Sequence, residues 1–95
     1  MFNIELLSQA EDELSEAYDW YEEQLTGLGN KLYIEVSHLL NLIETNPYYY
    51  PVKYGDLHSA VLNKFPYLII YWVDEVNNKV IIISVFHTSR KPKRF

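Results

Sequence analysis

Residues 66–88 read PYLIIYWVDEVNNKVIIISVFHT, and this stretch decides the fold. Its two halves are rich in Ile, Val, Tyr, Phe and Trp, the residue types that favour β-strands. Asn77 and Asn78 lie between the halves, and asparagine tolerates the positive φ angles of a two-residue hairpin turn. The stretch therefore predicts an antiparallel hairpin with strands over residues 66–74 and 79–88.

A two-residue turn also fixes which side chains share a face of the hairpin. It places Trp72 opposite Ile83, and Leu68 opposite His87. Both faces are then largely apolar. One face is predicted to carry Leu68, Ile70, Trp72, Ile81, Ile83, Val85 and His87. The other is predicted to carry Tyr67, Ile69, Tyr71, Val73, Val80, Ile82, Ser84 and Phe86.

The chain before this hairpin has helical periodicity, with apolar side chains recurring every three or four residues. A first helix is expected to begin at Ser8, because Ser8 and Glu11 have the spacing of a capping box. Gly27 and Gly29 end that helix and allow a tight turn. The second helix is expected over residues 30–45. Two amphipathic helices joined by so short a link must lie antiparallel.

Two further strands are expected, over residues 2–7 and 57–64. The order along the chain is then strand, helix, helix, strand, strand, strand. The 95 residues suffice for one domain. The sequence therefore predicts a single α+β domain over residues 1–95, with the pattern β-α-α-β-β-β and a helical hairpin packed on one face of a small antiparallel sheet.

The helical hairpin can cover only one of the two apolar faces. We expect the face that carries Trp72 to be the uncovered one. A face of that composition is too apolar to be left bare, and such patches usually mark an interface. The sequence thus predicts a docking surface for a partner protein. Two alternatives stay open, namely that the C-terminal tail folds back over this face or that the domain forms a homodimer.

Composition excludes several classes of protein. The chain has no cysteine, so it has no disulfide framework and no thiolate zinc site. The N-terminus lacks the basic region and apolar stretch of a signal peptide. The longest apolar run, residues 80–86, is far too short to cross a bilayer. We expect a cytoplasmic protein that needs no cofactor, no metal and no membrane.

The net charge of −5 is unevenly distributed. Residues 1–45 hold ten acidic side chains and one basic side chain, a charge of −9, whereas residues 46–95 hold three acidic and seven basic ones, a charge of +4. The basic half can meet an anionic partner although the whole chain is acidic. The alternative is a solvated acidic helix face together with a solvated basic tail.

Several short segments together resemble one family. They are Tyr18-Asp19-Trp20-Tyr21, Gly27-Leu28-Gly29, Asn46-Pro47 with Tyr50-Pro51, Phe65-Pro66-Tyr67, Tyr71, and His87-Thr88-Ser89-Arg90-Lys91-Pro92. In this order and spacing they resemble the RelE/ParE toxin superfamily of bacterial type II toxin–antitoxin modules, and more closely its ParE-like branch. The resemblance covers nearly the whole chain, and the fold of that family agrees with the fold predicted above.

The resemblance implies a toxin that a cognate antitoxin, usually encoded beside it, holds inactive by covering apolar surface. ParE-like members act on DNA gyrase, whereas RelE-like members cut mRNA on the ribosome. The leading hypothesis is a ParE-like toxin that binds gyrase without chemistry of its own. The residues expected to contact the antitoxin or the target are Leu68, Ile70, Trp72, Ile83, Val85, Lys64, Arg90 and Lys91.

Two alternatives accompany this hypothesis. The first is a ribosome-dependent mRNA endoribonuclease, in which His87 and Arg90 would be the catalytic residues. Cleavage of RNA needs a general base, a general acid and cations for the developing phosphorane charge, and one histidine with one arginine is a sparse set. The second is a non-toxic relative that only binds its antitoxin or itself. The acidic charge favours this second alternative, because toxins of this superfamily are usually basic.

Overall fold

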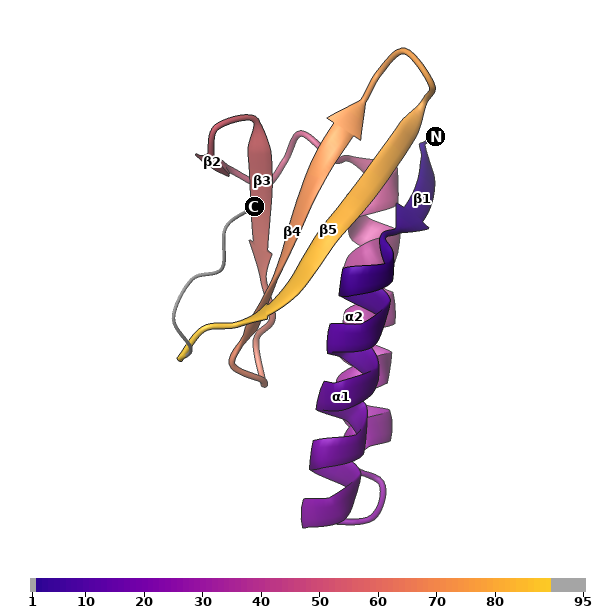
Figure 1. Cartoon of the computed structure of the whole chain (residues 1–95). Helices are drawn as coiled ribbons and strands as arrows, with labels where there is room; N and C mark the ends of the chain where they lie inside the picture. The colour runs from indigo at the N-terminus through magenta and orange to yellow at the C-terminus, as the bar shows by residue number, and fades with distance from the viewer. Residues whose placement is uncertain (1, 90–95) are drawn as a thin grey trace.

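The computed structural model describes residues 2–89, and Figure 1 shows the arrangement of its elements. Two helices pack against a five-stranded sheet, which confirms the α+β fold class and the helical hairpin. Within the described residues, neither helix is long and apolar enough to cross a membrane. The elements are β1 (Asn3–Leu6), α1 (Ser8–Gln24), α2 (Leu28–Thr45), β2 (Val52–Tyr54), β3 (Leu57–Val61), β4 (Tyr67–Asp74) and β5 (Lys79–His87).

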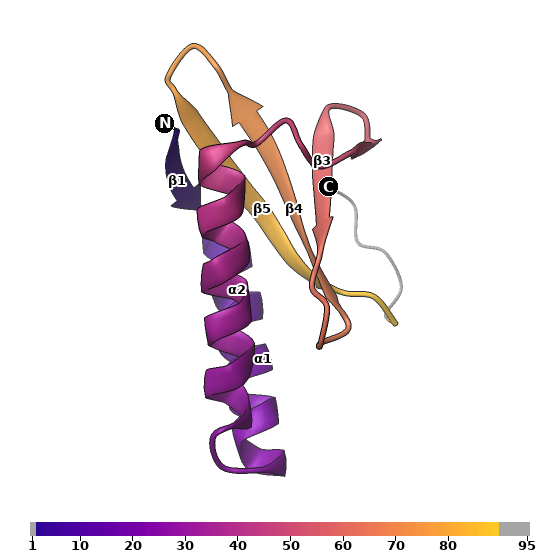
Figure 2. The ribbon, with the colours of Figure 1, turned by 180° about the vertical axis from the view of Figure 1, so that it is seen from behind.

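The helices α1 and α2 lie side by side and antiparallel. Their connected ends extend past the ends of the strands (Figures 1 and 2). Glu22 of α1 binds the backbone of this connection. The Glu22 carboxylate accepts hydrogen bonds from the backbone N–H groups of Gly27 at 3.0 Å and Gly29 at 2.9 Å. These N–H groups lie at the start of α2, where they lack helical partners and where negative charge is favourable. Glu22 thus caps the second helix from the first.

The predicted capping box at the start of α1 is wrong. Leu7 is the N-cap residue, and no side chain caps the helix. The Leu7 N–H donates to the Ile82 carbonyl at 3.0 Å, while the Leu7 carbonyl accepts the Glu11 N–H at 3.0 Å. The chain therefore passes directly from the sheet into the helix. The second helix begins at Leu28, two residues before the predicted start, because Gly27 adopts a φ of 93° and ends the turn there.

The sheet is mixed, whereas the sequence predicted an antiparallel one. Its strand order is β1-β5-β4-β3-β2, and β1 pairs with β5 in parallel. The other pairs are antiparallel. Strand β1 leads into α1 at one side of the sheet and runs in the same direction as its neighbour β5 (Figure 1). The short strand β2, within the predicted connector, was not predicted.

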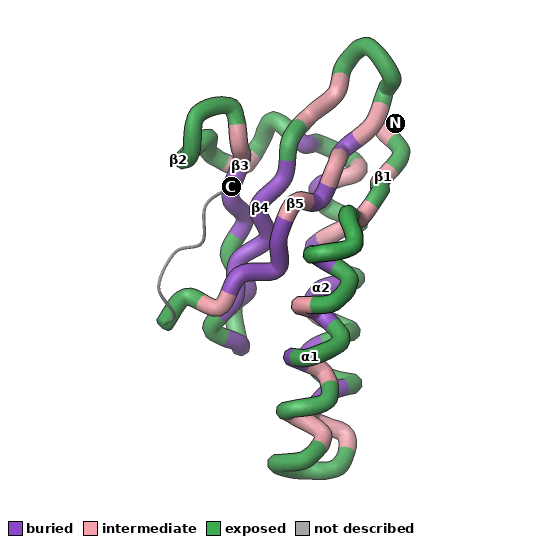
Figure 3. Tube along the Cα trace, viewed as in Figure 1, coloured by how far each residue is buried: buried purple, intermediate pink, exposed green. Residues whose placement is uncertain are grey.

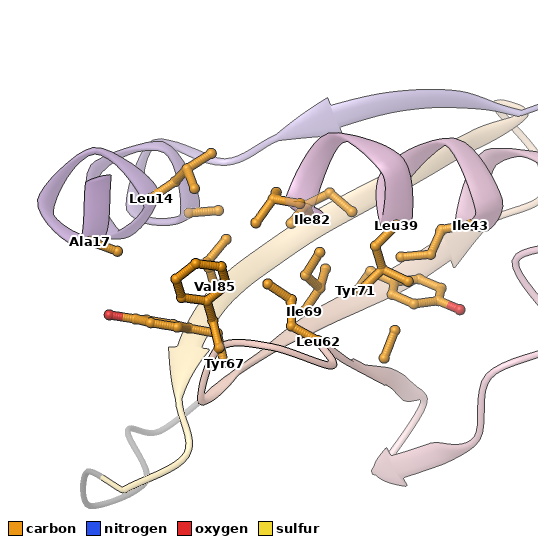
Figure 4. Close-up of a cluster of buried hydrophobic side chains, with 14 of the residues drawn as sticks. Leu14, Ala17, Leu39, Ile43, Leu62, Tyr67, Ile69, Tyr71, Ile82 and Val85 are labelled. Carbon is orange, nitrogen blue, oxygen red and sulfur yellow. The ribbon is translucent and has the colours of Figure 1, made fainter. Parts of the chain in front are cut away.

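The main core lies between the helical hairpin and one face of the sheet, as the buried segments in Figure 3 indicate. Figure 4 shows its side chains, which interleave from both layers. Tyr71 is fully buried in this core, and its hydroxyl donates a hydrogen bond to the Pro47 carbonyl. Burial raises the pKa of the Tyr71 hydroxyl. The core residues labelled in Figure 4 are Leu14, Ala17, Leu39, Ile43, Leu62, Tyr67, Ile69, Tyr71, Ile82 and Val85.

The turn between β4 and β5 is longer than predicted. Asp74 pairs with Lys79, so residues 75–78 form a four-residue loop. The Asp74 carboxylate accepts hydrogen bonds from the Asn77 backbone N–H at 3.3 Å and from its side-chain amide at 2.8 Å. Asn78 has a φ of 54°, the positive value that the sequence predicted there. The longer turn shifts the register, so that Trp72 lies opposite Ile81 and not Ile83.

Candidate partner-binding surface

A β-bulge divides the central hairpin into two halves with different registers. Ile70 pairs with Ser84, but Tyr71 pairs with Ile82, which leaves Ile83 between them without a partner in the ladder. An extra residue reverses the alternation of faces along the rest of its strand. The face assignments predicted for the end of β5 are therefore exchanged.

Val85 and His87 are consequently on the helix-covered side of the sheet, and their predicted place on the opposite face is wrong. Val85 is buried in the main core. His87 pairs with Tyr67, and the two rings meet edge to face with centroids 5.0 Å apart. The His87 Nδ1 atom accepts a hydrogen bond from the Ser89 N–H at 3.1 Å. Phe86 takes the place beside Leu68 that the sequence assigned to His87.

The face away from the helices has its own small apolar cluster. Leu68, Ile70 and Phe86 form it, with exposed fractions of 9%, 0% and 7%, and Leu57 and Ile83 pack against them. The prediction that this face is bare is therefore wrong at its centre. Leu68 and Ile70 contribute to the stability of the sheet and offer little area for contact with another chain.

The accessible part of this face lies closer to the β4–β5 turn. Trp72 is 41% exposed, and Ile81 opposite it is partly buried. On β5, two residues before Ile81, the Lys79 ammonium forms an ion pair with Glu5 at 3.3 Å. Trp72 is the most accessible of four apolar side chains that are each at least partly exposed and that we call the outer strip. The outer strip consists of Leu57, Trp72, Ile81 and Ile83.

Lys64 lies apart from the outer strip, in the loop between β3 and β4. Glu35 of α2 holds this loop, because its carboxylate accepts hydrogen bonds from the backbone N–H groups of Asn63 and Lys64. The Lys64 side chain is exposed. The other two predicted basic contacts, Arg90 and Lys91, lie outside residues 2–89.

The outer strip is a candidate binding surface. It presents apolar side chains and an ion pair at its end, an arrangement suited to contact with another protein. Within residues 2–89, no group of three His, Cys, Asp or Glu side chains could hold a metal ion. Of the proposed catalytic pair, His87 lies on the helix-covered side of β5 and Arg90 lies outside the described residues. The His87 ring therefore faces away from the outer strip.

Sequence reasoning missed three polar side chains that organise these surfaces. Glu13 binds the end of β5, Glu35 binds the β3–β4 loop, and His58 lies buried beside the core. The His58 ring stacks on Tyr71 with centroids 5.0 Å apart, and its Nδ1 atom lies 2.7 Å from the Tyr50 carbonyl oxygen. His58 follows Leu57 at the start of a predicted strand, but the local sequence gives no sign of its partners.

Comparison with known proteins agrees with this architecture. The model of the family described as "ParE toxin of type II toxin-antitoxin system, parDE" matches residues 4–92. One similar solved structure is described as "Chromosomal ParDE TA system from P. aeruginosa", with a TM-score of 0.81 and 13% sequence identity over 94% of this chain and 98% of that chain. At that identity the structural likeness shows the fold alone. The search of curated proteins found no match. Because the family model spans almost the whole sequence, this chain belongs to the ParE toxin family of type II toxin–antitoxin systems.

Proposed function

We propose that this chain is a toxin that binds and inhibits DNA gyrase, and that a cognate antitoxin neutralises it by covering the outer strip. The observation that carries this proposal is the match of the ParE toxin family to residues 4–92. Because the family belongs to toxin–antitoxin systems, the proposal gives the chain two protein partners. One is the antitoxin, and the other is the target.

The outer strip supports the first partner. Trp72 is a large aromatic side chain with 41% of its surface exposed, and tryptophan is among the residues that contribute most to protein interfaces. Ile81 and Ile83 beside it are partly exposed, so a second chain would remove further apolar surface from water. The Glu5–Lys79 ion pair would lie at the rim, where polar groups remain solvated.

The charge of the chain supports a protein target over a nucleic acid. Its net charge is −5, which disfavours binding to a phosphate backbone. Its only arginines are Arg90 and Arg94, both beyond the last strand. His87 faces the helices, so the accessible side of the sheet lacks the histidine that an RNA-cutting site was expected to use. These observations favour inhibition by binding over cleavage of mRNA.

Induction in a bacterium tests the proposal. We expect expression of the chain alone to stop growth and to induce the response to DNA damage. Coexpression of the antitoxin encoded beside it should restore growth. The variant His87→Ala should arrest growth as the unmodified chain does, whereas a ribosome-dependent nuclease would lose its mRNA cuts in this variant.

The outcomes separate the three functions. Arrest with intact mRNA and damaged DNA supports the proposal. Arrest with mapped mRNA cuts that require His87 and Arg90 would establish the nuclease and contradict it. Normal growth despite abundant soluble protein would identify a relative that only binds its partner. Each cell extract is also probed for the chain, so that absence of protein is not read as absence of toxicity.

A further inference from the structure

A second exposed surface, separate from the outer strip, lies on helix α1. It is the side of the helix opposite the buried residues Ala10, Leu14 and Ala17. Figure 3 shows this helix with exposed and buried segments in alternation, as expected for an amphipathic helix. The exposed side carries one large aromatic residue among acidic residues, and we call it the acidic side of α1. It consists of Asp12, Glu16, Asp19, Trp20 and Glu23, all of which are exposed.

The charges on this side do not stabilise the helix. Asp12 and Glu16 are four positions apart, as are Asp19 and Glu23, and like charges at this spacing repel each other. Within residues 2–89, none of these four carboxylates forms an ion pair. Glu23 also lies in the last turn of α1, where the helix dipole disfavours negative charge. The acidic side therefore lowers the stability of α1, and binding to a partner is a reason for the sequence to keep it.

Trp20 gives this side an apolar anchor that is held in place before a partner binds. Its side chain is 54% exposed. The Trp20 ring meets the Tyr21 ring edge to face, with centroids 4.9 Å apart. The Tyr21 ring in turn meets the Phe65 ring at 5.0 Å and packs against the main core. Because its neighbour is fixed, the exposed part of Trp20 can be covered by another protein at a small cost in side-chain entropy.

We propose that the acidic side of α1 is the surface that binds gyrase, and that it docks on the positively charged surface with which gyrase holds DNA. The inference rests on the proposed function, because gyrase is the target of that proposal. A protein that binds DNA presents lysine and arginine side chains to the phosphates. The carboxylates of Glu16, Asp19 and Glu23 would take the place of those phosphates. Trp20 would bury apolar surface among them, and the complementary charges would select the partner.

Other occupants fit this side less well. A nucleic acid or an anionic membrane surface would be repelled, because both carry negative charge. A second copy of this chain also has a net charge of −5, so two copies repel each other as they approach. The antitoxin of the proposed function has its own surface on the sheet, the outer strip. Target and antitoxin would therefore contact different residues of the chain, and variants can separate the two.

Binding of the chain to purified gyrase holoenzyme, measured by biolayer interferometry, tests the proposal. The test variant removes three charges from the acidic side of α1, with the substitutions Glu16→Gln, Asp19→Asn and Glu23→Gln. The matched control removes three charges elsewhere, with the substitutions Glu11→Gln, Glu44→Gln and Asp56→Asn. Each variant has three fewer negative charges than the unmodified chain of −5, so both have a net charge of −2. A further variant, Trp20→Ala, tests the anchor.

We expect the test variant to bind gyrase about tenfold or more weakly, and its affinity to depend less on salt. The control should bind within about threefold of the unmodified chain, because exposed charges outside an interface contribute little. Trp20→Ala should weaken binding about tenfold or more. Linear duplex DNA in excess should displace the unmodified chain from gyrase. All variants should bind the antitoxin encoded beside the chain within about twofold of the unmodified chain, because the outer strip is unchanged.

Each outcome decides the matter. Loss of gyrase binding in the test variant and in Trp20→Ala, with the control unchanged, antitoxin binding retained and DNA in competition, supports the proposal. Equal losses in the test variant and the control would reduce the effect to net charge and overturn it. Binding of gyrase by every variant, or binding that DNA does not affect, would also overturn it while leaving the proposed function standing. An unmodified chain that does not bind gyrase at all would overturn both. The test variant should unfold at the same or a higher temperature, since it loses the repulsion within α1.

Discussion

The carboxylate of Glu13 in α1 accepts the backbone N–H of Val85 in β5 at 3.0 Å. The same oxygen accepts the Ser84 hydroxyl at 2.7 Å. Strand β1 pairs only with residues 79–82, so the edge of β5 beyond the bulge has no neighbouring strand on that side. Glu13 replaces the missing strand, and its carboxylate satisfies an N–H group that would otherwise be buried without a partner. This contact ties the first helix to the bulge that exchanges the two faces of the sheet.

We expect Glu13→Ala to lower the free energy of unfolding by about 1–3 kcal/mol, because it leaves the Val85 N–H unpaired. Glu13→Gln should lower the free energy of unfolding by less, since its amide oxygen still accepts a hydrogen bond. Glu16→Ala serves as the control, because Glu16 lies on the exposed side of the same helix. Urea unfolding measures all three. Equal losses for Glu13→Ala and Glu16→Ala would show that the contact contributes nothing.

Gly29 gives a second prediction, at the close approach of the two helices. A Cβ atom at this position would lie 2.6 Å from the Tyr18 carbonyl oxygen and 2.6 Å from the Glu22 Cγ atom. Alanine normally favours a helix over glycine by about 1 kcal/mol. We nevertheless expect Gly29→Ala to destabilise the protein, because the backbone of α1 must move to make room. Ser37→Ala, on the exposed side of α2, is the control and should change the melting temperature little. A rise in melting temperature for Gly29→Ala would contradict the packing described here.

Tyr71 makes stability depend on alkaline pH. Burial raises the pKa of its hydroxyl above the ordinary value of 10.0, so the folded state favours the neutral form. The unfolded chain then loses this proton at lower pH than the folded chain does. The contribution of Tyr71 to the free energy of unfolding is therefore fully present below about pH 10. As the pH rises further, the free energy of unfolding falls by up to about 1.4 kcal/mol per pH unit.

The variant Tyr71→Phe tests this relationship. Near neutral pH it should be less stable by about 1–3 kcal/mol, because the Pro47 carbonyl loses its hydrogen bond. Above pH 10 its stability should fall less steeply than that of the unmodified protein. Tyr49→Phe is the control, since the Tyr49 side chain is 75% exposed. Parallel alkaline slopes for the unmodified protein and Tyr71→Phe would refute the assignment.

Trp72 gives the prediction that bears on binding. We expect Trp72→Ala to weaken binding of the antitoxin by about 30-fold or more, because large aromatic anchors commonly contribute at least 2 kcal/mol. The free energy of unfolding of the Trp72→Ala variant should change less, since the Trp72 side chain is 41% exposed. Val76→Ala is the matched control, because Val76 lies in the β4–β5 loop and is 94% exposed. Calorimetry that finds the same affinity for both variants would remove the outer strip from the interface.

Much of the fold follows from local patterns in the sequence. The apolar stripe with Leu14 and Ala17 predicts the first helix, and the stripe with Val36 predicts the second. The Ile- and Val-rich runs predict β4 and β5. These patterns repeat over many residues, so small errors at element ends do not change the result. The fold class was therefore predictable from the sequence alone.

The register of the sheet was not predictable in the same way. It depends on one extra residue at Ile83 and on the Asp74 carboxylate, which stabilises a four-residue loop. Both features arise from single contacts and not from periodicity. The predicted docking surface was partly wrong for the same reason, because the bulge places Val85 in the main core and Phe86 on the other face.

An open groove between α2 and the loop that joins β3 to β4 shows a further limit. Lys31, Ile34 and His38 follow a helical stripe that the sequence displays. The other wall, at residues 63–65, is distant in the chain, and Glu35 binds this segment to α2. A surface made by two distant segments has no local signal in a single sequence.

The proposed function is that this chain inhibits DNA gyrase by binding it and that an antitoxin prevents this. The most direct measurement is a supercoiling assay with purified gyrase, the purified chain and the purified antitoxin. The account predicts that the chain stops supercoiling and that an equimolar amount of antitoxin restores it. Supercoiling that continues unchanged with the folded chain in large excess over gyrase would contradict the account.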